Sequence, residues 1–273
     1  MRSFVVTGGG RGIGRAVAER LLRDGDYVVV VDLDAESLSW VADHPDGDRI
    51  AAVVGGAAEE TIVERAAERA EASAPLAGWV NNAAVFRDAG LDTAPASEVL
   101  DLINANLAPA LVGSSVAVRR MLAADRHGSI VNVSSHQAQR AVRGALPYAT
   151  AKAAIEGLTR ALAVDFGPHG IRVNAVALGS ITTQRYEEYL RSQGPKSASR
   201  VESEMARLHP LGRVGTPVEV AATVAFLLSD EASYINGAIL PVDGGRAVQG
   251  QDPEERDPDP SPLTLGGDVG RQH

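Results

Sequence analysis

The chain has no cysteine among its 273 residues, and only 4% of its residues are aromatic. Without thiols it can form no disulfide, no thiolate metal site and no cysteine nucleophile. Acidic residues outnumber basic ones, 35 against 26, and the resulting net charge of -9 disfavours binding to nucleic acid or to anionic membranes. Long apolar runs are also missing, since runs such as Tyr27–Val31 are far too short to span a bilayer. We therefore expect no nucleic-acid partner, no membrane partner and no metal.

A secretory signal is another missing feature. Strand-like residues begin almost at once in the segment MRSFVVTGGG, with no basic region and no long apolar stretch before them. The absence of cysteine agrees with a reducing compartment. The sequence therefore predicts a cytoplasmic protein.

What the chain does have is a regular alternation of short apolar runs with longer segments of helical periodicity. The predicted strands include Phe4–Val6, Tyr27–Val31, Gly78–Val80, Ser129–Val133, Ile171–Val176 and 237–242, and the predicted helices include Ile13–Arg23, 57–73, 147–166 and 217–229. Strands that are apolar on both faces and alternate with helices predict an α/β fold with a parallel sheet covered on both sides. The carboxyl ends of such strands form one edge, where ligands bind.

Two segments interrupt this alternation. Residues 180–212 are rich in arginine and have little strand character, so we interpret them as a helical flap inserted into a single catalytic domain over residues 1–246. Residues 247–273 are acidic and rich in Pro and Gly, a composition that predicts a mobile tail. A tail that binds a partner is the alternative interpretation.

A glycine-rich segment, Thr7-Gly8-Gly9-Gly10-Arg11-Gly12-Ile13-Gly14, joins the first predicted strand to the first predicted helix. Glycines allow the backbone to approach a pyrophosphate closely, and the helix amino terminus supplies free N–H groups. The predicted cofactor contacts here are Gly8, Arg11, Gly12, Ile13 and Gly14. Many glycine-rich turns are only turns, but the position at a first strand-to-helix junction favours dinucleotide binding.

The end of the second predicted strand carries Asp32, followed by Leu33. An acid at this position accepts the ribose hydroxyls of NAD and repels the 2′-phosphate of NADP. Two observations leave alternatives open: Asp32 could instead cap the next helix, a role that Asp34 would fill equally well, and Arg11 could pair with a 2′-phosphate. The sequence thus favours NAD over NADP as the cofactor.

Three residues predict proton-transfer chemistry. Ser135 follows a predicted strand, and Tyr148 and Lys152 lie four residues apart on one face of a predicted helix. A nearby cation favours phenolate, so Lys152 is expected to lower the pKa of Tyr148 toward neutrality. Ser135 can stabilise charge that develops on a substrate oxygen. A Tyr and a Lys packed on an exposed helix are the alternative.

In these features the chain resembles the short-chain dehydrogenase/reductase family over roughly residues 2–246. The matching segments are TGGGRGIG (7–14), NNAA (81–84), NANL (104–107), IVNVSS (130–135), YATAK (148–152), IRVNAVALG (171–179) and VDGG (242–245). The resemblance implies a Rossmann-type three-layer α/β/α sandwich with a seven-stranded parallel sheet, and a homotetramer or dimer. It also implies that Ser135, Tyr148 and Lys152 are catalytic, with Tyr148 and Lys152 contacting the cofactor.

Further roles follow only from the resemblance. Asn106 would be a fourth catalytic residue, holding a water that connects Lys152 to solvent. Asn82 would line the cofactor groove, whereas its neighbour Asn81 either lines the groove or braces the sheet, and the bracing role is favoured. Ile181 and Thr183 would contact the nicotinamide carboxamide.

Two departures from the family pattern concern the cofactor. The family usually has an Asp near the adenine after the third strand, where this chain has Gly55, and a Pro where this chain has Leu178. Adenine recognition would then depend on backbone groups. Neither departure removes a catalytic residue.

The predicted function is NAD-dependent interconversion of a secondary alcohol and its ketone. An NADPH-dependent carbonyl or ketoacyl reductase and a catalytically idle dinucleotide-binding sensor or scaffold are the alternatives. The segment after Ser135 is polar, with His136, Gln137, Gln139, Arg140 and Arg143. Together with the flap arginines it would suit a hydroxylated or anionic substrate, although solvated surface arginines and a locally hydrogen-bonded histidine explain the same residues. The sequence does not identify the alcohol.

Overall fold

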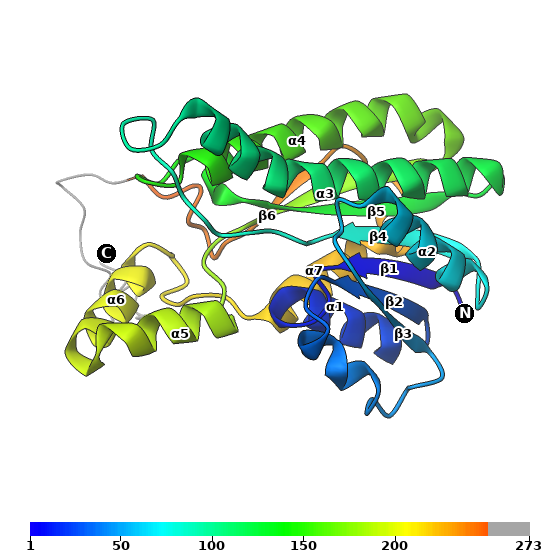
Figure 1. Cartoon of the computed structure of the whole chain (residues 1–273), viewed down its shortest axis with the longest axis horizontal. Helices are drawn as coiled ribbons and strands as arrows, with labels where there is room; N and C mark the ends of the chain where they lie inside the picture. Colours follow the sequence, from blue (N-terminus) through cyan, green and yellow to red (C-terminus); the bar gives the residue numbers. More distant parts are fainter. Residues whose placement is uncertain (251–273) are drawn as a thin grey trace, which may run out of the picture.

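Seven parallel strands form one sheet in the order β3-β2-β1-β4-β5-β6-β7 (Figure 1). Their bounds are β1 Ser3–Thr7, β2 Tyr27–Asp32, β3 Ile50–Val54, β4 Leu76–Asn81, β5 Gly128–Ser135, β6 Ile171–Leu178 and β7 Ile239–Val242. This computed structural model describes residues 1–250, so most of the predicted tail lies outside the described residues. The predicted Rossmann-type fold with a seven-stranded parallel sheet is confirmed.

Helices cover both faces of the sheet. The helices are α1 Gly12–Arg23, α2 Glu60–Glu71, α3 Ala96–Ala123, α4 Leu146–Phe166, α5 Gln184–Gln193, α6 Pro195–Arg207 and α7 Pro217–Leu228, and the 3₁₀ turns are η1 Glu36–Val41, η2 His136–Ala138, η3 Gly167–His169 and η4 Asp230–Ala232. Helices α1 and α7 lie on one face, and α2, α3 and α4 lie on the other. The result is a three-layer sandwich, visible in Figure 1.

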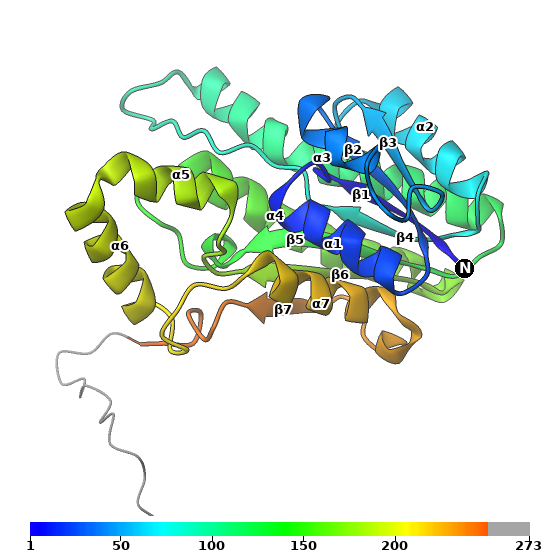
Figure 2. The same cartoon turned by 90° about the horizontal axis from the view of Figure 1, so that it is seen from below.

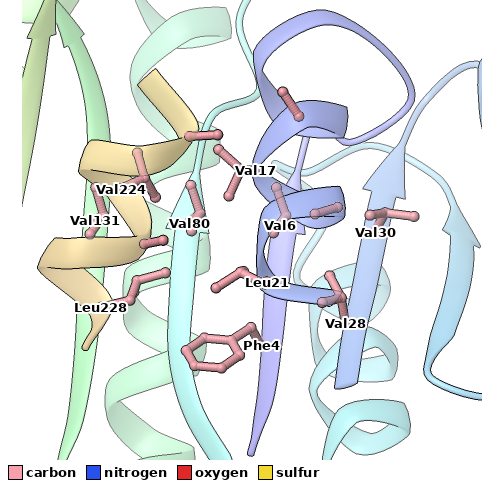
Figure 3. Packing of buried hydrophobic residues seen from close by; sticks show 14 of the residues in the cluster. Phe4, Val6, Val17, Leu21, Val28, Val30, Val80, Val131, Val224 and Leu228 are labelled. Atoms are coloured by element: carbon pink, nitrogen blue, oxygen red, sulfur yellow. The ribbon is translucent and has the colours of Figure 1, made fainter. Parts of the chain in front are cut away.

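Strand alternation divides the core between the two faces. Val6 and Val30 point toward α1 and α7, as Figure 3 shows, whereas their neighbours Val5 and Val29 pack against the other layer. All four side chains are fully buried. The central strands are therefore apolar on both faces, as expected for a parallel sheet between two helical layers.

Strand β3 was not among the predicted strands, and helix α3 was not among the predicted helices. It spans 28 residues with Pro109 in its interior, and its apolar residues do not form one narrow stripe. By length and composition it is apolar enough to cross a membrane. In the fold its apolar character is explained by packing, because it contacts β4, α2 and α4 at once.

Strand order reverses between β1 and β4, and ligands of such folds bind outside the carboxyl ends of the strands at this point. The Thr7 hydroxyl at the end of β1 accepts hydrogen bonds from the backbone N–H groups of Asn82 and Ala83, 3.1 and 3.2 Å away. Helices α5 and α6, which occupy most of the segment 180–212, lie beyond the carboxyl ends of the strands in both Figure 1 and Figure 2.

Candidate active site

The glycine-rich segment forms a tight loop between β1 and α1. Gly8 adopts a φ of +66°, a conformation that favours glycine. A Cβ atom at Gly14 would lie 2.1 Å from the carbonyl oxygen of Gly8, so the loop closes on the helix only because a side chain is absent. Sequence analysis predicted both glycines as cofactor contacts, and the structure places them at the reversal point of the sheet.

The amino terminus of α1 is open to an anion. Its N-cap residue, Arg11, makes no side-chain capping bond, and the first turn, which includes Gly12 and Ile13, carries no acidic residue. Free N–H groups and the helix dipole attract negative charge at such an end. A Cβ atom at Gly12 would approach only the side chain of Thr183, at 3.7 Å. The loop therefore fits the pyrophosphate of a dinucleotide.

Asp32 at the end of β2 supports the same loop. One of its carboxylate oxygens accepts a hydrogen bond from Gly10 N–H at 3.0 Å, and the other accepts one from Asp34 N–H at 3.2 Å. The next residue, Leu33, is 74% exposed. Asp34 Oδ1 accepts from Glu36 N–H at 3.0 Å, although the N-cap position of the following turn is Ala35 and neither aspartate occupies it.

Gly55, where the family usually has an acid, follows β3. Its φ is +149°, and a Cβ atom there would lie 2.6 Å from Ile62 Cδ1. An Asp would need a different backbone path at this position. Packing against α2 thus explains this departure from the family pattern.

The two asparagines after β4 brace the site. The side-chain amide of Asn82 donates to the carbonyls of Thr7 and Gly8, at 3.1 and 3.0 Å, and so fixes the glycine loop. Asn81 is buried and connects the layers, since its amide donates to Asn132 Oδ1 at 2.8 Å and to Ser114 Oγ at 2.9 Å. The bracing role predicted for Asn81 agrees with these bonds.

Ser135, Tyr148 and Lys152 meet at the carboxyl edge of the sheet. Ser135 ends β5, and its hydroxyl is close enough to the phenol of Tyr148, on the first turn of α4, to act on the pKa of that phenol. Lys152 is only 2% exposed, and its Nζ donates to the carbonyl of Val133 at 2.7 Å. That Nζ lies 5.4 Å from the centroid of the Tyr148 ring. The structure thus brings these three predicted residues together.

The pKa values of this group differ from expectation. Burial raises the pKa of Tyr148 to about 12, although the Ser135 hydrogen bond and the charge of Arg185 act in the opposite direction. Burial also lowers the pKa of Lys152 to about 8. The expected lowering of the Tyr148 pKa by Lys152 was wrong, because desolvation is the largest effect on the phenol and Lys152 is not among the groups that shift its pKa. Tyr148 is therefore a neutral acid with a proton to give.

An aromatic and cationic stack covers Tyr148. The ring of Phe86, from the loop after β4, lies 5.3 Å from the ring of Tyr148. The guanidinium of Arg185, on the first turn of α5, lies 3.8 Å from the centroid of Phe86. Sequence reasoning missed Phe86 and counted Arg185 only as one of the flap arginines. No local pattern joins them, since the contact crosses about a hundred residues of chain.

The remaining predicted residues make structural contacts. Asn106 is fully buried, and its side chain accepts from Val85 N–H at 3.0 Å and donates to Leu102 O at 3.1 Å. Among the described residues no hydrogen bond joins Asn106 to Lys152, so its relay role stays a prediction. Thr183 caps α5 by accepting from Tyr186 N–H at 3.4 Å.

Ile181 lies two residues before this cap and forms an isolated bridge with Gly215. It also packs against the core on the α1 and α7 face. Contacts of Ile181 and Thr183 with a nicotinamide therefore stay predictions as well.

Comparison with known proteins agrees with this geometry. Residues 8–247 match the family model described as enoyl-(acyl carrier protein) reductase. Levodione reductase of Leifsonia aquatica is 32% identical over 253 residues, covering 90% of this chain and 94% of that protein. The chain belongs to the short-chain dehydrogenase/reductase family. Its short-chain reductase relative NovJ of Streptomyces niveus is 39% identical over 245 residues, covering 89% of this chain and 92% of that protein.

Solved structures show the same relationship. The crystal structure of levodione reductase superposes with a TM-score of 0.82 at 32% identity and covers 90% of this chain and 98% of its own. The ligand-free structure of the aldohexose dehydrogenase of Thermoplasma acidophilum superposes with a TM-score of 0.81 at 30% identity. This match covers 94% of this chain and 97% of that chain. The chain is therefore an oxidoreductase of CH–OH or carbonyl groups, and the family uses a nicotinamide dinucleotide.

Proposed function

We propose that this enzyme interconverts a secondary alcohol and its ketone with NAD, and that Tyr148 is the general acid and base. The main support for the proposal is that Ser135, Tyr148 and Lys152 lie close together. They lie at the same edge of the sheet as the loop Gly8–Gly14, which is suited to bind an anion. The test is a screen of alcohols and ketones against NAD and NADP, followed by substitution of Tyr148. Failure of every pair to react would contradict the enzymatic proposal.

In reduction, the phenol of Tyr148 donates its proton to the substrate oxygen. The dinucleotide, when bound, supplies or accepts the hydride. Ser135 donates to the same oxygen and stabilises the charge that develops there. Lys152 can exchange a proton near neutral pH, since its pKa is about 8, and it is suited to return the proton that Tyr148 loses. In oxidation the phenolate takes the proton, and the nearby charge of Arg185 favours that form.

Residues Gly8, Arg11, Gly12, Ile13 and Gly14 would hold the pyrophosphate, and Asp32 and Leu33 would lie at the adenosine ribose. An NADPH-dependent reductase remains the alternative that Arg11 favours, because its exposed guanidinium lies at the N-cap of α1. An idle binding protein is less well supported. Lys152, the only lysine of α4, is only 2% exposed and lies beside Tyr148. A role in binding alone gives no reason to bury a lysine there.

Replacement of Asp32 by Asn should shift cofactor preference. We expect the ratio of NAD to NADP affinity to fall by roughly 10-fold or more, since the negative charge that repels a 2′-phosphate is removed. Asn keeps an oxygen that can accept from Gly10 N–H, so the loop should stay in place. Fluorescence titration with NADH and NADPH measures both constants.

The matched control is Asp34→Asn, a second exposed carboxylate two residues away that bonds only within its own turn. It should leave the ratio unchanged. Tighter binding of NADP than NAD by the unmodified enzyme would contradict the assignment of Asp32 and favour the NADPH alternative.

We also propose that the enzyme is a cytoplasmic homotetramer. Apolar side chains on the outer surfaces of α3 and α4 support an assembly, with Leu100 57%, Leu111 50% and Val164 75% exposed. Light scattering coupled to gel filtration should give four chain masses. The double change Leu111→Glu with Val164→Glu should reduce the mass to a dimer or monomer, and a monomeric parent enzyme would contradict the proposal.

A further inference from the structure

A cavity of about 350 Å³ adjoins the catalytic group at His136, the residue after Ser135. It is lined by His136, Arg140, Val142, Leu208 and Arg246, which come from η2 and its following loop, the end of α6 and the segment after β7. A larger depression, of about 480 Å³, lies between the ends of α2 and α3 near the start of β4, at the opposite end of the sheet. Only the smaller cavity is next to Ser135.

His136 presents a hydrogen-bond acceptor to this cavity. Its Nδ1 lies 3.1 Å from the carbonyl oxygen of Leu178. A carbonyl only accepts, so Nδ1 carries the proton. Burial, and after it the charge of Arg246, lowers the pKa of His136 against the smaller opposing effects of the Leu178 hydrogen bond and Asp243, and the ring stays neutral near pH 7. Nε2 is therefore a lone-pair acceptor, and it is buried without a partner among the described residues.

Arg246 presents to the same cavity a cation that has no ion-pair partner within 4.0 Å among the described residues. One guanidinium N–H donates to Ser180 Oγ at 2.9 Å. The nearby carboxylate of Asp243 uses its two oxygens for Gly245 N–H and Ala247 N–H, at 3.0 and 2.7 Å. Within residues 1–250, neither Arg246 nor Arg140 has an ion-pair partner within 4.0 Å. Two arginines thus face the cavity with their charge available.

We propose that this cavity binds the far end of the substrate, and that the substrate is a hydroxylated carboxylic acid. Its carboxylate would pair with Arg246 and Arg140, and a hydroxyl near that carboxylate would donate to His136 Nε2. This proposal rests on the proposed function only in assigning the other end of the ligand to Ser135 and Tyr148. A cavity of about 350 Å³ is within the usual range for small-molecule sites.

A second buried acceptor lies on the same turn as His136. The side-chain oxygen of Gln137, on the same turn η2, is also buried without a partner in the described residues. The backbone N–H of Gln137 donates to Ser135 Oγ at 3.2 Å, so this turn is fixed beside the reacting group. Buried acceptors are costly unless a donor reaches them, and of these two acceptors the one on His136 belongs to a residue that lines the cavity.

The test compares matched acids and alcohols. Aldonic acids of four to six carbons, such as gluconate, are titrated against alditols of the same chain and stereochemistry, such as glucitol, with NADH present at saturation. The two members of a pair differ only in a carboxylate against a CH₂OH group. We expect at least one acid to bind roughly 10- to 100-fold more tightly than its alditol, as charge-assisted bonds to arginine suggest.

Substitutions test which side chains cause the difference in affinity between acid and alditol. Arg246→Met keeps the length of the side chain and should remove most of the acid's advantage, while Arg246→Lys should restore part of it. His136→Leu should weaken acid and alditol alike, because both carry the hydroxyl. Arg23→Met, an exposed position at the far end of α1, is the control and should change nothing.

Two results would overturn the proposal. One is that no acid binds more tightly than its alditol, and the other is that the acid's advantage survives Arg246→Met and Arg140→Met together. Thermal melting and NADH titration of each variant exclude a folding defect. Because the readout is binding, a chain that binds acids but turns nothing over would contradict the proposed function and leave this inference intact.

Discussion

Replacing Tyr148 by Phe should lower kcat by roughly 100- to 10,000-fold, the usual contribution of a general acid or base. The change removes one hydroxyl and leaves the ring that packs against Phe86 at 5.3 Å. Stability should change by no more than about 1 kcal/mol, the usual net contribution of one hydrogen bond. NADH affinity should stay within about twofold. Steady-state kinetics on a substrate from the alcohol and ketone screen measures the effect.

The control for this experiment is Tyr234→Phe. Tyr234 is fully exposed after α7, so loss of its hydroxyl should not affect turnover. Undiminished turnover by Tyr148→Phe would contradict the mechanism. A parallel fall in NADH affinity would show instead that Tyr148 acts mainly in cofactor binding.

The order of elements was predictable because the signals are local. Apolar runs such as Tyr27–Val31 became β2, and the segment 147–166 became α4 with Pro147 in its first turn. Helix α3 escaped detection for a physical reason. It is packed on several sides and contains Pro109, so neither a single apolar stripe nor an uninterrupted helical pattern marks it.

The candidate site was predictable where the family motifs carry it. Ser135, Tyr148 and Lys152 converge as their spacing implied, and the loop Gly8–Gly14 lies at the reversal of strand order. Their electrostatics were not predictable. The sign of the Tyr148 pKa shift depends on how much water the fold excludes, which the sequence does not record. The stack of Phe86 and Arg185 likewise exists only after distant segments have folded together.

Because Lys152 is buried, its replacement should change both the activity and the stability of the enzyme. Lys152→Met should abolish most turnover, with a loss of roughly 100-fold or more, because a proton-exchanging cation beside Tyr148 is removed. At pH 7 the same variant should be more stable than the parent enzyme. The side chain of Lys152 is only 2% exposed, so the folded protein bears the cost of desolvating an ammonium that Met does not have.

The size and pH dependence of that gain follow from the pKa values. Burial lowers the Lys152 pKa from 10.5 to about 8, a cost on the order of 3 kcal/mol to the charged form. The lost bond to Val133 O offsets part of it, and the expected net gain is on the order of 1 to 2 kcal/mol. Between pH 8 and 10.5 the unfolded chain binds more protons than the folded one, so the parent enzyme gains stability as pH rises.

The advantage of Lys152→Met should therefore be largest below pH 8 and vanish above pH 10.5, where the folded and the unfolded parent chain are both neutral at this position. Urea unfolding at pH 7 and pH 9.5 measures it. Lys196→Met, at the only other lysine of the chain and an exposed position on α6, provides the matched control and should show no gain at either pH. A variant less stable than the parent at pH 7 would mean that the buried ammonium is stabilised by contacts that outweigh its desolvation, and Lys152 would then be a structural cation as much as a proton donor.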